Sequence, residues 1–374
     1  MLKIGKQAVS LFIKKISKIL PVWKDIDVIS VLKAIEPYNY TPAVNNDELP
    51  AAFQHQFSQR ASIPERSIYI LNNVKCTYDC IVFKNLKIFI PSLAAEWNKD
   101  ILDYSFLLRQ WYGHHFSLAP SADGVALIYD QWSGNYYHWL IDCLPRLLIL
   151  KEKFPDYLLL LPKDRAPFME TTTRIMGFHN YLYIERNQIL DAHKVIVPEH
   201  AAHTLFHDPA LILRVRNELL DGLGCVKKKP QRRIYISRST QRKRRVANES
   251  EVREIVRKYN FEIIHFESMT FEDQVVLMEE AEVVIGVHGA NMANILFMQP
   301  KCIVVEMLNA NAVNPLYFRL SSYLNLAYYA LPCDHIIEES LNTGLGPVPS
   351  ANSYDIIVDL EKLGDILRKI FEIM

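Results

Sequence analysis

The stretch from Ala281 to Met298 constrains the fold of this chain most, because it predicts a strand, a tight turn and the start of a helix. Apolar residues of strand character, Val283 to Val287, end at His288-Gly289-Ala290, and a helical pattern begins near Asn291. Such a junction directs unpaired backbone N–H groups and the positive end of a helix dipole at one place. We therefore expect a phosphate or another anion to bind there.

Strand and helix patterns alternate along two separate parts of the chain, which predicts parallel βαβ units and an α/β fold. The second part is expected to form a Rossmann-like sheet of at least four parallel strands. Asn248 and Thr270 are expected to cap helices there through their side chains. Before the first part, short strands are expected on either side of a turn at Asn72-Asn73. The expected strands lie at residues 125–129, 157–162 and 194–198 in the first part, and at 234–237, 262–265, 283–287 and 303–307 in the second.

Length and composition favour a two-domain protein with a large core. A chain of 374 residues, 50% of them apolar, exceeds the size at which single cores usually divide. The 42 basic and 42 acidic residues balance, so no overall field favours nucleic acid as a partner. The six cysteines include no CxxC pair and favour buried thiols, with a Cys76–Cys80 bridge left open. We expect a basic amphipathic helix (1–24), an N-terminal α/β domain (25–225), a C-terminal Rossmann-like domain (226–350) and a helix packing back across the domains (351–374).

Residues 2–20 alternate apolar and lysine-rich faces at helical spacing and end at Pro21. The apolar stretches between the lysines are too short to cross a membrane or to form a secretory signal. Two interpretations remain: a helix lying on an anionic membrane surface, or a helix docking on protein. We expect a cytoplasmic protein, and the first interpretation would make it peripheral on the inner face of the membrane.

Polar side chains gather where the strands of the second part end, and ligands of open α/β sheets bind at those ends. They include Arg238, His288 and Glu306, which suit an anionic ligand that also carries hydroxyl groups. Ten lysines and arginines lie between Lys227 and Arg245 without a single acid. We expect Arg238 to bind phosphate and Lys227 to Lys229 to form a solvated surface.

In the first part, His138, Asp142 and Arg146 recur every four residues in an otherwise apolar helical segment. They are therefore expected near one face of that helix. One interpretation is a structural Asp142–Arg146 salt bridge with His138 at the helix start. The other is a general base facing a cleft, either His138 or Asp142.

Three blocks of sequence, taken together, resemble glycosyltransferase family 61, a group of capsular polysaccharide biosynthesis enzymes. They are YYHWLIDCLPRLLIL, then IYISR with its arginine-rich loop and Asn248-Glu249, and then FESMTFEDQVVLMEEAEVVIGVHGANMANILFM followed by VVEM. They occur in this order over roughly residues 120 to 310. Residues 1 to 110 contribute nothing to the resemblance.

The resemblance implies a GT-B-like fold, in which two Rossmann-like domains face across a cleft, and an inverting sugar transfer from a nucleoside diphosphate sugar, expected to be UDP-linked. The acceptor is expected to be a glycan or lipid-linked oligosaccharide of surface polysaccharide biosynthesis. The expected catalytic residues are His138 and Asp142, with Asn135, Tyr137 and Arg146 on the acceptor side. The expected donor-binding residues are Ser237, Arg238, Arg242, Asn248, His288, Gly289, Ala290, Asn291, Asn294 and Glu306.

No cofactor or metal is expected, because the leaving diphosphate is assigned to these side chains and backbone N–H groups. The single Asp-x-Asp match, Asp25-Ile26-Asp27, lies outside both nucleotide-binding patterns. Kinases and dinucleotide-dependent oxidoreductases are disfavoured because neither GxxxxGK[ST] nor a GxGxxG after a strand is present. A non-catalytic subunit that binds nucleotide sugar or polysaccharide remains the alternative.

Overall fold

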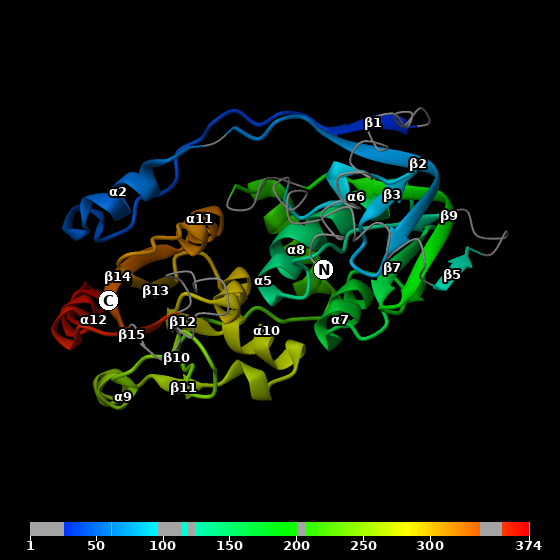
Figure 1. Cartoon of the computed structure of the whole chain (residues 1–374). Helices are drawn as coiled ribbons and strands as arrows, with labels where there is room; N and C mark the ends of the chain where they lie inside the picture. Colours follow the sequence, from blue (N-terminus) through cyan, green and yellow to red (C-terminus); the bar gives the residue numbers. More distant parts are fainter. Residues whose placement is uncertain are drawn as a thin grey trace, which may run out of the picture. The chain divides into compact units, whose positions relative to one another are not determined.

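A computed structural model of the chain forms two compact units (Figure 1). The first comprises Met1–Glu36 and Ser62–Val215, and the second comprises Pro37–Ala61 and Arg216–Met374. The amphipathic helix predicted for residues 1–24 lies outside the described residues. The structure describes residues 26–60, 62–95, 114–118, 124–200, 206–336 and 354–373.

Residues 37–61 group with the second unit, although the expected domain ranges assigned them to the first. The reason is local packing around α2 (Ala51–Ser58). The ring of Phe57 stacks on Phe318 with centroids 4.2 Å apart. The side chain of Asn45 also exchanges two hydrogen bonds with the backbone of Ala330, at 2.8 and 3.1 Å. These contacts attach the segment to the second unit before the chain returns to the first at Ser62.

The first unit is built on a mixed sheet of nine described strands in the order β4-β3-β2-β9-β6-β7-β8, with β1 on β2 and β5 on β9. Strands β9, β6, β7 and β8 are parallel, as the alternation predicts, whereas β1 to β4 are antiparallel additions. The strands are β1 (Ile26–Leu32), β2 (Arg66–Thr77), β3 (Val82–Lys84), β4 (Lys87–Ile88), β5 (His114–Ser117), β6 (Val125–Ala126), β7 (Leu158–Pro162), β8 (Tyr181–Ile184) and β9 (Gln188–Pro198).

The helices of the first unit follow strand ends, and one of them contains a π-helical segment. The helix after β6 consists of an α-helical turn, five π-helical residues and a further α-helix. Its side chains between Trp139 and Leu150 are buried, so it is a core helix. The helices are η2 (Ile90–Ser92), α5 (Tyr136–His138), the π-helical η3 (Trp139–Cys143), α6 (Leu144–Lys153), α7 (Pro167–Ile175) and α8 (Pro209–Gly222).

The second unit contains a six-stranded sheet in the order β11-β10-β12-β13-β14-β15. All neighbouring pairs from β11 to β14 are parallel, which confirms the Rossmann-like prediction, and β15 is antiparallel. Because helices cover a parallel sheet, its central strand β12 is almost entirely buried. The strands are β10 (Arg232–Ile236), β11 (Glu262–Ile264), β12 (Ala281–Val287), β13 (Ile303–Asn309), β14 (Ala327–Ile336) and β15 (Asp355–Ile357).

Apolar side chains of α9 and α12 pack with the sheet in one core of the second unit, with Val252 and Leu367 among them. The C-terminal helix therefore contributes to that core. The remaining helices are η1 (Asn46–Glu48), α9 (Glu249–Lys258), η4 (Phe266–Ser268), α10 (Phe271–Glu279), η5 (Ala290–Phe297), α11 (Leu316–Tyr323) and α12 (Leu360–Ile373). Within the described ranges, none of the helices is long and apolar enough to cross a membrane.

Two local predictions were wrong and three are confirmed. Strand β2 continues through Asn72-Asn73 without a turn, although Asn73 takes a left-handed backbone (φ 53°) inside the strand. A helix follows His288 as predicted, and it is the 3₁₀-helix η5. Asn248 precedes α9 but makes no capping hydrogen bond. Thr270 caps α10 as predicted, by accepting from the N–H of Asp273 at 3.1 Å. All six cysteines are free thiols, as the first interpretation predicted.

Candidate functional site

His138 and Asp142 form a short hydrogen-bonded pair in the first unit. Asn135 caps the helix start by accepting from the N–H of Tyr137 at 2.9 Å. Residues four apart on a helix lie on the same face. As a result, Nδ1 of His138 lies 2.6 Å from Oδ2 of Asp142. The carboxylate is 7% exposed and the imidazole 21%, so the histidine is the partner that faces solvent.

His207 holds the second oxygen of the same carboxylate. Its Nε2 lies 2.8 Å from Oδ1 of Asp142, and its side chain is 4% exposed. Burial raises the pKa of Asp142, but the hydrogen bonds from His138 and His207 outweigh it and hold the pKa below its ordinary value. An ionised carboxylate only accepts hydrogen bonds, so both imidazoles donate to it. Donation from Nδ1 of His138 leaves its Nε2 as the atom that takes up a proton.

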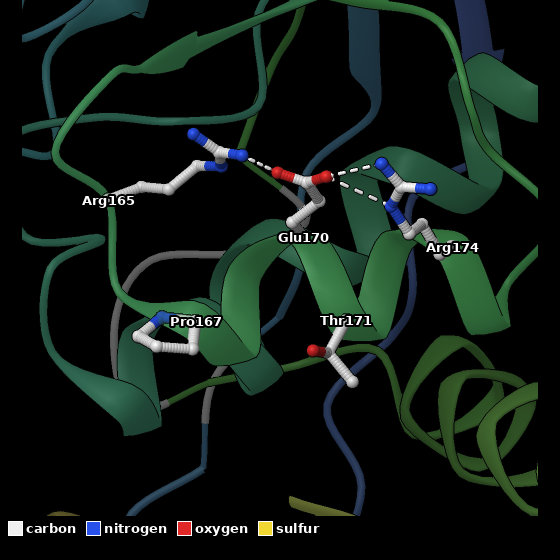
Figure 2. A pocket seen from close by; sticks show the side chains of 5 residues that line it. All are labelled: Arg165, Pro167, Glu170, Thr171 and Arg174. Atoms are coloured by element: carbon white, nitrogen blue, oxygen red, sulfur yellow. Dashed lines mark hydrogen bonds and ion pairs between the residues drawn. The ribbon is translucent and has the colours of Figure 1, made fainter.

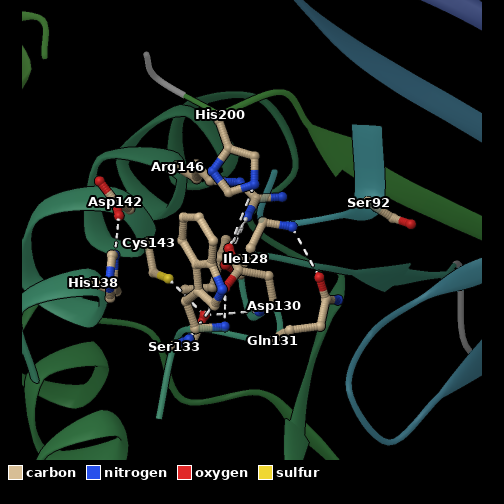
Figure 3. A network of polar contacts seen from close by, with 12 residues as sticks. Ser92, Ile128, Asp130, Gln131, Ser133, His138, Asp142, Cys143, Arg146 and His200 are labelled. Carbon is tan, nitrogen blue, oxygen red and sulfur yellow. Dashed lines mark hydrogen bonds and ion pairs between the residues drawn. The ribbon is translucent and has the colours of Figure 1, made fainter. Parts of the chain in front are cut away.

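The expected Asp142–Arg146 salt bridge and the acceptor-side role of Arg146 were wrong (Figure 3). Arg146 is 1% exposed and donates to the carbonyls of Ile128 and Pro198, both at 2.9 Å. Its ionic partner is Asp130, whose Oδ2 lies 3.7 Å from Nη1 of Arg146. The inserted π-turn changes the phase of the helix after Asp142 and thereby turns Arg146 toward the ends of β6 and β9. Arg146 fixes these strand ends together.

Asp130 organises the loop that precedes the helix (Figure 3). Its Oδ1 accepts from the N–H of Trp132 at 2.9 Å and from Oγ of Ser133 at 2.8 Å. Nε2 of His200 lies 3.4 Å from its Oδ2, and burial next to Arg146 lowers the pKa of His200 to about 4. The loop places the ring of Trp132 5.2 Å from the ring of His138. Aromatic rings of Trp132 and the buried Tyr137 thus flank the partly exposed imidazole of His138.

At the corresponding strand ends of the second unit, Arg238 lies against Gly289. The guanidinium donates to the carbonyls of Arg244 at 3.0 Å and Lys243 at 3.2 Å. A Cβ atom on Gly289 would lie only 2.6 Å from Nη1 of Arg238, so this contact requires glycine. Burial, and then the neighbouring charge of Arg244, lower the pKa of Arg238. Such a partly desolvated cation is suited to an anionic ligand.

His288 forms a second histidine–carboxylate pair. Its Nδ1 lies 2.6 Å from Oε1 of Glu306, and Oε2 of Glu306 accepts from the hydroxyl of Tyr328 at 2.6 Å. Glu306 is fully buried, so its expected direct contact with the donor was wrong. Strand β13 continues to Asn309, two residues further than predicted, which places Glu306 inside the sheet. Its role is to hold His288.

The turn after His288 presents free backbone donors. Tyr317 donates to the carbonyl of Gly289 at 2.6 Å, and Arg244 to that of His288 at 3.3 Å. In the part of the chain that the structure describes, the N–H groups of Gly289, Ala290 and Asn291 donate no hydrogen bond. Three N–H groups beside Arg238 are thus available at the turn where the sequence predicts that an anion binds.

The other predicted donor residues divide into exposed and structural ones. Arg242 is exposed and has no ion pair among the described residues. Ser237 is fully buried and donates to Glu249 at 2.6 Å. The fully buried Asn294 donates to Gln274 at 2.9 Å, and Asn248 exchanges hydrogen bonds with the backbone of Val358. Direct contact of the buried Ser237 and Asn294 with a ligand was therefore a wrong expectation, because polar side chains at strand ends also serve the fold.

A surface pocket of about 320 Å³ lies over α7 in the first unit, lined by Arg165, Pro167, Glu170, Thr171 and Arg174. Figure 2 shows both arginines pointing at Glu170, which pairs with each of them. The guanidinium of Arg165 also lies 4.1 Å from the ring centre of Tyr183. The pocket contains none of the predicted site residues, and both of its arginines pair with the same glutamate. In the described ranges, no group of three or more His, Cys, Asp or Glu side chains is placed to hold a metal ion.

Comparison with known proteins identifies the class that this site defines. The family model described as Glycosyltransferase 61 matches residues 136–305. That range includes His138, Asp142, Arg238 and His288 and ends one residue before Glu306. The chain is therefore similar to glycosyltransferase family 61 over these residues, and the resemblance predicted from sequence is confirmed there.

One relative is the EGF domain-specific O-linked N-acetylglucosamine transferase of Drosophila melanogaster. It is 31% identical over 102 residues, which make up 26% of this chain and 19% of the relative. The chain thus matches only a small part of that protein's length. Together, the two comparisons support glycosyl transfer as the general class of activity.

His207 is the residue of this site that sequence reasoning missed. It lies 65 positions after Asp142, beyond any helical spacing that links residues to one another. A local signal does exist, because the following Asp208 caps α8 by accepting from the N–H of Ala210 at 3.0 Å. The histidine is thereby fixed at a helix start that follows the carboxyl end of β9. A His-Asp pair at the start of a helix that follows a strand is therefore the sequence signal that could have indicated His207.

Proposed function

We propose that the protein is an inverting, metal-independent glycosyltransferase of GT-B architecture. It transfers a sugar from a UDP-linked donor to a hydroxyl group of a glycan or lipid-linked oligosaccharide acceptor, in the biosynthesis of a surface polysaccharide. The observation that carries the proposal is the orientation of His138. Its Nδ1 is bound to the buried Asp142, which leaves Nε2 of this 21%-exposed side chain available as a general base.

On the acceptor side, Nε2 of His138 removes the proton from the attacking hydroxyl group. The oxygen forms a bond to the anomeric carbon while the bond from that carbon to the diphosphate oxygen breaks on the opposite face, which inverts the configuration. The proton remains on His138, and Asp142 stabilises the resulting imidazolium. The carboxylate is itself held in place by His207, so the base is pre-oriented before the acceptor binds.

On the donor side, the leaving diphosphate gains negative charge as its bond to the sugar breaks. Arg238, His288 and the N–H groups of Gly289 to Asn291 are assigned to stabilise it. Fixed donors of this kind need no reorganisation during the reaction, and removing one costs about 2.7–4 kcal/mol of transition-state stabilisation in enzymes of other classes. Arg242, exposed on the basic loop, is assigned to the same diphosphate.

The relative's name suggests which donor to test first, because it specifies transfer of N-acetylglucosamine. The experiment incubates the purified protein with UDP-N-acetylglucosamine and other nucleotide sugars and measures release of the nucleoside diphosphate with an acceptor mixture. Transfer by the wild type that is lost in His138→Ala, with donor binding retained, is the expected result. Donor binding with no transfer to any acceptor would instead identify a non-catalytic nucleotide-sugar-binding subunit.

The cellular part of the proposal rests on the sequence of residues 1–20, which lie outside the described residues. We place the protein in the cytoplasm, on the inner face of the membrane, where this basic helix binds anionic lipid. Flotation with vesicles containing anionic phospholipid, comparing the full chain with one that lacks residues 1–20, tests it. Equal flotation of the two forms would contradict this assignment.

A further inference from the structure

The ribose of a nucleotide donor needs a hydrogen-bond acceptor that the site as described lacks. Carboxylates at strand ends of Rossmann-like sheets commonly accept from ribose hydroxyl groups. Glu306, to which the sequence assigned this role, is fully buried. Its two oxygens are occupied by His288 and Tyr328. A different carboxylate must therefore be sought on the surface of the second unit.

Glu267 is exposed and directly connected to the anion site. It lies in η4, immediately after β11, and its Oε1 accepts from two side chains. Nδ2 of Asn291 donates to it at 2.8 Å and Nε2 of Gln241 at 2.5 Å. Asn291 belongs to the turn with the free N–H groups, and Gln241 belongs to the basic loop. The carboxylate therefore lies next to both elements that are assigned to the diphosphate.

The charge of Glu267 is unexpected at this position. The adjacent segment carries ten cations between Lys227 and Arg245, yet Glu267 forms no ion pair with any residue that the structure describes. Its charge does act on the nearby Arg238. A carboxylate beside a diphosphate repels it, so a negative charge here is unfavourable unless the ligand also presents donors. Vicinal hydroxyl groups are such donors, and Oε2 of Glu267 accepts no hydrogen bond within the described part of the chain.

We propose that Glu267 binds the 2′- and 3′-hydroxyl groups of the donor's ribose and so selects ribonucleotides. The proposal rests on the proposed function, because it takes the donor to be a nucleoside diphosphate sugar. Oε2 accepts from the diol, while Asn291 and Gln241 fix the carboxylate through Oε1. Hydrogen bonds to a charged group are among the stronger ones in proteins.

The test compares the affinities of UDP, 2′-deoxy-UDP and UDP-N-acetylglucosamine, measured by calorimetry on the full-length protein. The wild type should bind UDP about tenfold or more tightly than 2′-deoxy-UDP, and Glu267→Gln should lose most of this preference by weakening UDP binding alone. Glu272→Gln, the same change at an exposed site on α10, serves as the matched control. Gln241→Ala removes one support of the carboxylate and should retain the preference, since Asn291 still holds Oε1.

Three outcomes would overturn the assignment, and they are distinguishable. An unchanged ratio of UDP to 2′-deoxy-UDP affinity in Glu267→Gln contradicts ribose binding. Loss of affinity for UDP-N-acetylglucosamine alone would show that Glu267 contacts the transferred sugar instead. A wild-type protein that binds none of the three ligands refutes the proposed function, and the ribose assignment with it.

Discussion

Replacing Gly289 by alanine should disable the anion site while leaving the fold intact. The backbone of Gly289 is extended (φ 171°, ψ 168°), a conformation that alanine adopts without strain. The new Cβ, however, would lie 2.6 Å from Nη1 and 3.2 Å from Cζ of Arg238. The guanidinium cannot simply rotate, because hydrogen bonds to the carbonyls of Lys243 and Arg244 hold it. Arg238 must therefore move away from the position in which it is proposed to bind the diphosphate.

The expected loss of UDP affinity follows from the hydrogen bonds that the displaced Arg238 would no longer make to the diphosphate. A hydrogen bond to a charged group contributes about 1.5–3 kcal/mol, so displacing the guanidinium should weaken UDP binding about 10- to 150-fold. The folded state loses at most the two hydrogen bonds to the carbonyls, each contributing about 0.5–1.5 kcal/mol. We therefore expect a large loss of affinity and a modest decrease in Tm.

A double-mutant cycle tests this reasoning. UDP affinity is measured by calorimetry for the wild type, Gly289→Ala, Arg238→Ala and the double variant. Because the clash needs the guanidinium, Gly289→Ala should cost little once Arg238 is absent. The reasoning is refuted if Gly289→Ala binds UDP like the wild type, or if its penalty is the same with and without Arg238.

Further predictions concern the base, acid stability and metal dependence. His138→Ala should lower kcat about 10²- to 10⁴-fold with the Kd for UDP unchanged, and parallel loss of both would argue against a base. The pKa of Asp142 is depressed in the fold, so its stabilisation is present above its unfolded pKa and lost as pH falls below about 4. In urea melts at decreasing pH, the free energy of unfolding should therefore fall more steeply for the wild type than for Asp142→Asn. Equal dependence on pH in the two proteins would contradict this. Transfer should persist in EDTA; loss that manganese restores would disprove metal independence.

The sequence predicts the second unit better than the first for a physical reason. Parallel strands buried on both faces leave continuous apolar runs, which are visible without knowing their partners. The antiparallel strands of the first unit lack that signal. Strand β2 is interrupted in sequence by Asn72-Asn73, which resembles a turn, but the strand passes through because β9 supplies its hydrogen bonds on both sides of Asn73. Pairing with a distant strand decided the conformation there.

In the candidate site, spacing located His138 and Asp142 but could not show their partners. Spacing assumes a regular helix, but the π-turn at Trp139–Cys143 interrupts the α-helix between His138 and Arg146. Arg146 therefore pairs with Asp130 and not with Asp142. The second partner of Asp142 is His207, which lies 65 residues further along the chain. Strand-end position likewise indicated Arg238 and His288 as candidates. It misplaced Glu306, because β13 continues to Asn309 and leaves Glu306 buried inside the sheet.

The two histidine–carboxylate pairs show that surroundings decide the task of such a pair. In both, a carboxylate more buried than the histidine binds Nδ1 at 2.6 Å, so the pairs themselves are nearly equivalent. Aromatic rings flank His138, and the nearby guanidinium of Arg146 is engaged by strand carbonyls. Its environment suits a neutral hydroxyl group that gives up a proton. His288 also has an aromatic neighbour, since the ring of Tyr317 lies 5.3 Å from its ring, but Arg244 donates to its carbonyl and the free N–H groups follow it in the chain. That environment favours a ligand that brings negative charge. The roles proposed for the two histidines, a base in one unit and an anion ligand in the other, would thus arise from one arrangement in two electrostatic environments.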